Sequence, residues 1–462
     1  MLTLFDVDAR RNRRSFLKIG ATAGVGGWLG GLGALAGSAA ELPGLTTGKS
    51  VVFLFLHGGP SQFETFDPKM NRPEGIRSAT GEIATRIPGV TFGSSFPGLA
   101  SRADRLVVVR SFVPGDPDHN LKPLVGRDSF GANPGAVASS VSGTNDPSTG
   151  IPTNVLLLPR AVDATTRPGT TAFGRFDGVG SLSSAFAPFD PSRGDAGESL
   201  RLGIPRERLT DRRLLQRRLD DAIRSIDANS HDESHGLLRE QAYRLIEGGL
   251  SEAFDLERED PRLVERYDTA PLVRPDAIDK KWKNYDNYVD NAKSLGKLML
   301  LARRLCERGA KFVTVTTNFV WDMHSDENNA PMVEGMRYMA PPLDRAISAF
   351  LDDLASRGLE NDILLVACGE MGRTPRINGK GGRDHWGGLG PLLLAGGGLP
   401  RGQVIGRSNL DASGPQSEPV TGKHLLGTIV RTLFDPGLLR LVPNLPREFS
   451  QTMAGYDPIP GL

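Results

Sequence analysis

Short apolar runs that alternate with segments of helical period constrain the fold of this chain most. Each run is bounded by glycine, proline or polar residues, which is typical of buried strands, and the run over 51–56 is rich in β-branched and aromatic residues. Between the runs lie charged segments with apolar residues on one face. The clearest such face is formed by Leu295, Leu298, Leu301 and Leu305. Strands that alternate with helices predict an α/β fold, a doubly wound, mainly parallel sheet with helices on both faces.

The expected elements can be placed along the chain. Strands are predicted over residues 51–56, 105–112, 152–159, 311–317, 361–368 and 391–398. Helices are predicted over 281–308, 342–356 and 422–434, after a charged helical stretch from 210 to about 259. The 56 glycines and 33 prolines predict many turns and long loops. We therefore predict one α/β domain over residues 41–462, with a helical insertion at about 210–300.

The first 40 residues have the anatomy of an export signal. A basic head is followed by a glycine- and alanine-rich middle and by small residues, and the twin arginines Arg13 and Arg14 precede Ser15, Phe16, Leu17 and Lys18. We predict a twin-arginine signal peptide over residues 1–40 that is cleaved near Ala40. The protein would meet the twin-arginine export machinery, touch the membrane only through this segment, and end in the periplasm or outside the cell. An uncleaved membrane anchor is the alternative, disfavoured because the glycines lower the hydrophobicity.

Composition limits the partners and the ligand types. The formal net charge is +1, and nothing in the charge pattern calls for nucleic acid. The two cysteines, Cys306 and Cys368, stand in apolar surroundings without a CxxC spacing, which favours buried thiols over a disulfide or metal ligands. Any metal would therefore be bound by oxygen and nitrogen atoms.

Histidines and carboxylates recur where the predicted strands end. The histidines are His57, His119, His324 and His385, and the carboxylates near them are Asp118, Asp322, Glu370 and Asp384. The carboxyl ends of parallel strands share one rim of a sheet, so these side chains are expected to converge. Imidazole and carboxylate suit Zn²⁺, Mn²⁺ or a related ion, and two ions about 4 Å apart favour phosphoryl or sulfuryl transfer. A single Asp-His pair is more typical of a turn, but the recurrence favours a metal site.

The glycine-rich stretch GEMGRTPRINGKGGRDHWGG, residues 369–388, contains three arginines, of which Arg373 and Arg383 flank the loop. A guanidinium group matches a tetrahedral oxyanion with two parallel hydrogen bonds, so Arg373 and Arg383 are candidates for substrate binding. The acids of the same stretch would also pair with these arginines in the absence of any ligand. Both interpretations stay open at this point.

A serine esterase is the other enzyme class that the sequence suggests. The turn HGGP, which follows the strand expected over 51–56, resembles the oxyanion-hole turn of α/β-hydrolases. That fold also requires a nucleophile elbow, G-x-S-x-G, and the sequence contains none. The serine esterase is therefore disfavoured.

The order of these motifs carries a family resemblance. The leader, HGGPSQFETFDPK, RSF with a following Asp-His, WDMHSD, GEMGRTP, GRDHWGG and LLAGGG together resemble the bacterial domain-of-unknown-function family numbered 1501, over roughly residues 50–434. That family is grouped by resemblance with the alkaline phosphatase and sulfatase superfamily, whose sheet usually carries two divalent metal ions on its rim. The resemblance implies an exported hydrolase of sulfate or phosphate esters with divalent ions, Zn, Mn or Ca. The alternative is a non-catalytic binding or cell-envelope protein that retains the fold.

The resemblance also implies roles for single residues. Asp322 and His324 would bind one ion, and Glu370, Asp384 and His385 the other. His57 stands where the superfamily usually has an acidic ligand, which is a departure. Arg373 and Arg383 would bind the oxyanion, and His119 or Asp384 would move protons.

The nucleophile departs from the superfamily pattern more seriously. The superfamily uses threonine, serine or a modified cysteine after its second strand, whereas this chain has PGDPDHNLKP there, without a hydroxyl or thiol beside His119. Ser61, Ser129 or a water molecule is left as the attacking group, and we take Ser61 as the candidate nucleophile.

Overall fold

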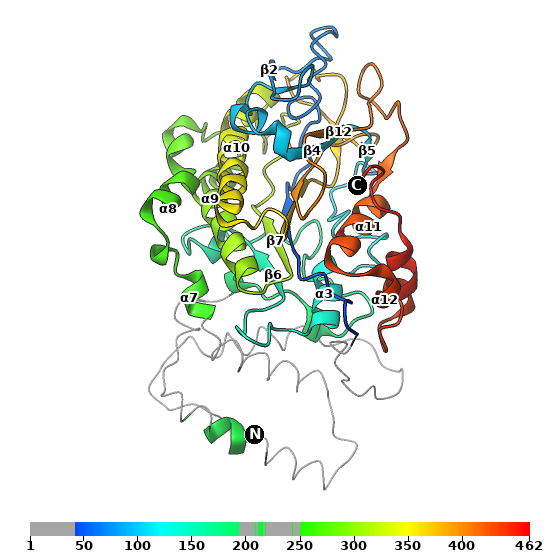
Figure 1. The fold of residues 1–462 in the computed structure, drawn as a ribbon. Helices are drawn as coiled ribbons and strands as arrows, with labels where there is room; N and C mark the ends of the chain where they lie inside the picture. Colours follow the sequence, from blue (N-terminus) through cyan, green and yellow to red (C-terminus); the bar gives the residue numbers. More distant parts are fainter. Residues whose placement is uncertain (1–41, 194–207, 209–210, 216–217, 219–242, 244–249) are drawn as a thin grey trace.

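The computed structural model describes residues 42–193, 208, 211–215, 218, 243 and 250–462 (Figure 1). The predicted signal segment, residues 1–40, and most of the helical stretch predicted from 210 onward lie outside the described residues. Within the described part of the chain, no helix combines the length and the apolar character needed to cross a membrane.

A seven-stranded sheet forms the centre of the molecule, in the order β12-β4-β11-β8-β1-β7-β6 (Figure 1). β11 runs antiparallel to both of its neighbours, while the other pairings are parallel. The strands are β1 (Ser50–Phe55), β4 (Leu106–Val109), β6 (Asn154–Leu157), β7 (Phe312–Thr316), β8 (Ile363–Cys368), β11 (Leu392–Gly396) and β12 (Gln403–Ile405). The chain thus has an α/β fold with a mixed, mainly parallel sheet.

Helices cover both faces of this sheet (Figure 1). The longer helices are α3 (Pro134–Ser142), α9 (Tyr285–Glu307), α10 (Met332–Arg357) and α11 (Gly422–Leu433). The shorter ones are α2 (Pro97–Ala100), α7 (Leu250–Phe254), α8 (Pro261–Tyr267) and α12 (Pro436–Leu439). Short strand pairs lie outside the main sheet: β2 (Glu82–Ala84) with β3 (Thr91–Gly93), β5 (Phe112–Val113) with β13 (Val420–Thr421), and β9 (Gly372–Arg373) with β10 (His385–Trp386).

The residue alternation of β1 divides the apolar core in two. Val52 and Leu54 belong to the cluster that contains the buried faces of α9 and α10, whereas Phe53 and Phe55 belong to the cluster that contains α3 and α11. Every residue of β1 is buried, because a central parallel strand is covered on both sides. This explains why the strand is a continuous apolar run in the sequence.

The predicted strands are confirmed with small shifts of their ends, but three features differ from the prediction. Residues 403–405 form β12, which was not predicted, and Phe112 lies in β5 rather than in β4. The helix predicted from residue 342 begins at Met332, because Pro341 and Pro342 are accommodated inside α10. Met336 and Met339 bury the same core as Leu343, and this packing outweighs the hydrogen bonds lost at the prolines.

The reversed direction of β11 determines which residues reach the rim. β8 ends at Cys368, which lies opposite Leu392 at the start of β11. The whole segment from Gly369 to Pro391 therefore begins and ends on the rim where β1 and β7 also end. The loops after β1, β7 and β8 and the approach to β11 meet there.

Candidate metal centre

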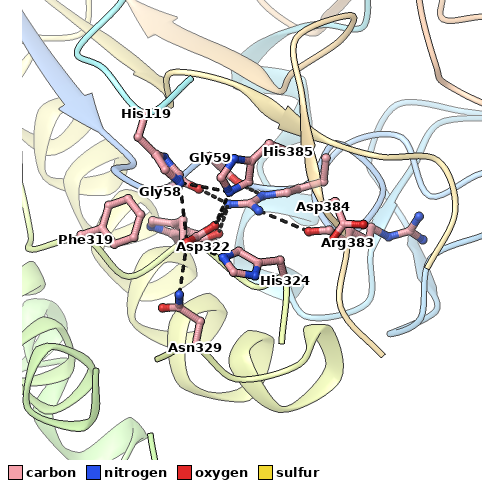
Figure 2. A network of polar contacts seen from close by, with 12 residues as sticks. Gly58, Gly59, His119, Phe319, Asp322, His324, Asn329, Arg383, Asp384 and His385 are labelled. Carbon is pink, nitrogen blue, oxygen red and sulfur yellow. Dashed lines mark hydrogen bonds and ion pairs between the residues drawn. The ribbon is translucent and has the colours of Figure 1, made fainter. Parts of the chain in front are cut away.

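Three side chains from three separate loops bring their ligand atoms to one point (Figure 2). His119 follows β5, Asp322 follows β7, and His385 lies in β10. The Nε2 atoms of His119 and His385 are 3.1 Å apart, and His385 Nε2 is 3.1 Å from Asp322 Oδ1. His119 Nε2 is 3.6 Å from Asp322 Oδ2, and one ligand atom from each residue lies within 4.8 Å of the others.

The donor atoms fit a divalent cation. Zn–N bonds of about 2.0–2.1 Å place the ligands of a tetrahedral ion about 3.3 Å apart, close to the separations of these three atoms. When two neutral imidazoles face each other through Nε2, only one can donate a proton while the other presents a lone pair. Two imidazoles and a carboxylate form a ligand set that Zn²⁺ or Mn²⁺ accepts. The group can hold one ion, and the second predicted ion stays a prediction.

Glu370 lies behind His119 and not at the point where the three ligand atoms meet. Its Oε1 is 3.0 Å from His119 Nδ1, and the backbone N–H of Gly58 donates to its carboxylate oxygens at 2.9 and 3.2 Å. The Glu370 side chain is fully buried. A carboxylate on Nδ1 leaves the Nε2 lone pair of His119 free to bind a metal. In this structure Glu370 therefore orients His119, and its predicted role as a ligand stays a prediction that the three-ligand group does not require.

Asp322 is the centre of the hydrogen bonds at the rim. Arg373 Nη2 donates to Oδ1 at 2.7 Å, Asn329 Nδ2 donates to Oδ2 at 3.1 Å, and His324 Nε2 lies 2.9 Å from Oδ2. Burial raises the pKa of Asp322, but Arg373 and the histidines lower it by more, so the net shift is downward. The carboxylate is therefore ionised and able to bind a cation.

Arg373 is fully buried and faces the protein. Besides Asp322, its guanidinium donates to the carbonyl oxygens of Gly58, Gly59 at 2.7 Å, and Arg383 at 3.2 Å. These contacts join the loops after β1 and β7 to the hairpin of β9 and β10. The guanidinium that was predicted to bind substrate instead positions Asp322.

Arg383 is directed away from the three ligands (Figure 2). Its η nitrogens donate to backbone carbonyl oxygens, including those of Ile76 and Arg77 at 2.9 Å each, and its Nε lies 3.4 Å from Glu64 Oε1. Burial lowers the pKa of Arg383, although Glu64 partly offsets the effect. The side chain of Arg383 is fully buried against the protein, so its predicted role in binding the oxyanion stays a prediction that this arrangement does not support.

Glycines allow the loops that carry the ligands to touch through their backbones. A Cβ atom on Gly387 would lie 2.1 Å from the carbonyl oxygen of Gly115, in the loop that leads to His119. A Cβ on Gly382 would lie 2.3 Å from the carbonyl carbon of His324. Both glycines lie close to His385 in the sequence. They therefore let the segment of His385 lie directly against the loop of His119 and the loop of His324.

His57 and Asp384 lie outside the three-ligand group. The His57 ring is buried among phenylalanines, burial lowers its pKa, and its Nε2 has no hydrogen-bond partner among the described residues. Asp384 is exposed, and its Oδ1 accepts a hydrogen bond from Asn378 Nδ2 at 2.9 Å. The three-ligand group includes neither residue, so their roles as metal ligands stay predictions.

The two candidate serines serve local turns. Ser61 Oγ accepts from the backbone N–H groups of Phe63 at 3.2 Å and Glu64 at 3.4 Å. Ser129 Oγ accepts from the N–H of Gly126 at 2.9 Å. Ser61 is buried, and its hydrogen bonds within the described part of the chain involve none of the histidines. The structure gives it no activating base within the described residues.

Two of the histidines have raised pKa values. Burial lowers the pKa of His119, but its hydrogen bonds to Asp322 and Glu370 raise it by more. The hydrogen bond to Asp322 is the main reason that the pKa of His324 is raised. Protons and a cation therefore compete for the same nitrogen atoms.

Some site residues had no signal in the sequence. Asn329, which holds Asp322, stands in a polar run without a motif. The Asp118-His119 dipeptide placed His119 among the histidines expected at the rim, but the sequence analysis assigned His119 to proton transfer and not to the ligand set. Phe173 and Phe319, whose rings contact His119, looked like ordinary apolar positions.

A cavity of about 790 Å³ lies elsewhere, lined by residues such as Leu158, Arg160, Thr170 and Phe176. None of the histidines in the described part of the chain lines it. We place the chemistry at the rim, because the converging ligand atoms are there.

Comparisons with known proteins support a family assignment. Residues 48–436 match the model of the family described as "Protein of unknown function (DUF1501)", so the chain belongs to that family. A search of curated proteins found no match. Among solved structures, the crystal structure of the phosphonate monoester hydrolase of Agrobacterium radiobacter is similar at 10% identity, covering 84% of this chain and 74% of that one, with a TM-score of 0.32. A likeness of that size carries no argument about the fold or the activity.

Proposed function

We propose that this protein is an exported, metal-dependent hydrolase of phosphate or sulfate esters with an alkaline-phosphatase-like fold. The observation that carries the proposal is the convergence of His119 Nε2, His385 Nε2 and the Asp322 carboxylate on the rim. The twin-arginine leader supports export to the periplasm or beyond. The family resemblance of the sequence supports the substrate class.

His119, Asp322 and His385 would hold the divalent ion. A divalent ion bound there would act as a Lewis acid toward the oxygen atoms of a phosphoryl or sulfuryl group. Glu370 fixes the orientation of His119, and Arg373 keeps Asp322 anionic. Because the Ser61 hydroxyl serves a turn, we propose water as the attacking group in place of Ser61.

His324 is the candidate for proton transfer to the leaving oxygen. Its side chain is 24% exposed, and its Nε2 lies beside Asp322 Oδ2 at 2.9 Å. The neighbouring carboxylate favours the protonated imidazole, which is the form that donates a proton. His119, the earlier candidate for this role, is less accessible at 13% exposure and is held from both ring nitrogens.

A binding protein without turnover is the second candidate. The specific observation in its favour is that Arg373 and Arg383, the predicted anion ligands, direct their guanidinium groups at the protein. Such a protein would bind the metal ion at the same residues and release no product.

Metal analysis combined with ester hydrolysis tests the proposal. The purified protein is expected to contain Zn or Mn and to hydrolyse 4-nitrophenyl phosphate or 4-nitrophenyl sulfate. Chelation and the substitution His385→Ala should abolish both properties. The matched control is His424→Ala, because His424 lies in the N-terminal capping box of α11. Metal binding without hydrolysis of either ester would favour the binding protein, and a folded protein that binds no metal would refute the site.

Export is tested separately. Cell fractionation followed by N-terminal sequencing should find the protein in the periplasm or the medium, beginning near residue 41. A protein that stays in the cytoplasm with its leader intact would contradict this part of the proposal.

A further inference from the structure

One side of the candidate metal centre is aromatic. The rings of Phe173 and Phe319 stack on each other with centroids 4.4 Å apart and an interplanar angle of 28°. Both rings contact the His119 imidazole, at 5.2 and 4.6 Å between centroids. The two rings come from different loops. Phe319 lies on the same loop as Asp322, and Figure 2 shows these two residues side by side.

The two phenylalanines are half-buried rather than enclosed. The His385 and His324 side chains, on the polar side of the centre, are 34% and 24% exposed. The accessible surface around Asp322 therefore has a polar part, which suits an anionic group, and an apolar part beside His119. A molecule with its anionic end at the histidines would bring its organic end within reach of the phenylalanines.

We propose, on the basis of the proposed function, that Phe173 and Phe319 bind the organic part of the ester and select esters that carry an aromatic ring. Offset and edge-to-face contacts between aromatic rings are favourable beyond the area that they bury. A stacked pair already held against His119 offers a third ring such a contact without reorganisation. A small alkyl group on the same anion gains much less from this surface.

Two phosphonates that differ only in their organic group test the proposal. Neither the phenyl nor the methyl group is a leaving group, so the titration measures binding without any effect of ester reactivity. The Zn²⁺- or Mn²⁺-loaded protein is titrated by calorimetry with phenylphosphonate and with methylphosphonate. We expect phenylphosphonate to bind at least about fivefold more tightly to the wild type, and Phe319→Ala to remove most of this preference.

The ratio of the two affinities separates binding from packing. If the phenylalanines only shield His119 from water, Phe319→Ala weakens both phosphonates equally and the ratio stays that of the wild type, which overturns the proposal. Phe319→Leu keeps the apolar bulk and should lose most of the preference. Phe130→Ala is the matched control, because Phe130 is also half-buried and pairs with Phe449 in another part of the molecule. It should keep the wild-type ratio.

The outcomes also separate this proposal from the proposed function. If both phosphonates bind with equal affinity to the wild type, the aromatic preference is refuted while an anion site remains. If neither phosphonate binds to the metal-loaded protein, the hydrolase proposal and the aromatic surface are both refuted.

Discussion

The ligand cluster on the sheet rim and the ionic cluster between α9 and α10 each surround a buried carboxylate, Asp322 and Asp353, but their charges are balanced differently. In the ionic cluster, Arg303 Nε lies 2.8 Å from Asp353 Oδ2 and its Nη2 lies 2.9 Å from Glu259, while Arg357 Nε lies 2.8 Å from Asp353 Oδ1. Guanidinium groups thus face carboxylates throughout. At the rim, two imidazole Nε2 atoms face each other at 3.1 Å beside one carboxylate.

This difference separates a stabilising cluster from a binding one. In the ionic cluster the guanidinium groups of Arg303 and Arg357 lie against carboxylates of the opposite charge, so the protein itself balances the charge. Two facing imidazole nitrogens beside one carboxylate are satisfied by protons that they donate to each other or to that carboxylate, or by a cation that all three residues bind. The convergence of ligand atoms from three residues, rather than the amount of buried charge, therefore marks the candidate metal centre.

The largest expected effect is the loss of metal affinity in Asp322→Asn. The amide removes the anionic ligand while keeping the shape of the side chain, so the affinity for Zn²⁺ should fall by more than about a hundredfold. Competition with a chromophoric chelator measures it. Asp384→Asn is the control, since that carboxylate is exposed and outside the ligand group, and it should bind metal like the wild type. Equal affinities for the two variants would contradict the site.

A substitution in the ionic cluster should lower the stability of the protein and leave its metal affinity unchanged. Asp353→Asn weakens the charge-assisted hydrogen bonds to Arg303 and Arg357, so the free energy of unfolding should fall by about 2 kcal/mol. Urea denaturation measures this change. Asp352→Asn, next in the sequence but partly exposed, should cost less. A loss of metal affinity in Asp353→Asn would mean that the two clusters are not independent.

The glycine contacts of the hairpin predict a smaller effect. In Gly387→Ala the new Cβ would lie 2.1 Å from the carbonyl oxygen of Gly115, so the hairpin of His385 must move away from the loop of His119. Because this movement separates two ligands, metal affinity should fall by about tenfold. Gly379→Ala, in the same stretch, meets nothing within 4 Å and should leave metal affinity unchanged. If both alanine variants bind metal equally well, these glycines do not position the ligands.

The smallest effect is a dependence of stability on pH in the metal-free protein. The folded-state pKa values of His119 and His324 are raised, so the stability that they contribute is complete below their ordinary pKa and is lost as the pH rises through the folded-state values. Metal affinity should rise over the same interval, because protons leave the ligands. Thermal unfolding at several pH values tests this, and Asp322→Asn should flatten the profile. An unchanged profile in that variant would contradict the prediction.

The sequence predicted which residues lie at the rim of the sheet better than it predicted the role of each residue there. Asp322 and His385 were expected at strand ends, because apolar runs identify strands and parallel strands share a rim. The reversal of β11, which brings both ends of the segment 369–391 to that rim, has no local signal, since strand direction is set by long-range pairing. The direction of the Arg373 and Arg383 side chains depends on carbonyl groups distant in sequence. Glu370 appeared as a ligand because a motif does not show which side of His119 a carboxylate contacts.

Anomalous diffraction from crystals of the protein grown with Zn²⁺ tests the central claim most directly. We predict one strong peak at the zinc edge within about 2.3 Å of the Nε2 atoms of His119 and His385 and of an Asp322 oxygen, with Glu370 still bonded to His119 Nδ1. A zinc ion bound elsewhere, while the two Nε2 atoms remain hydrogen-bonded to each other, would contradict the account.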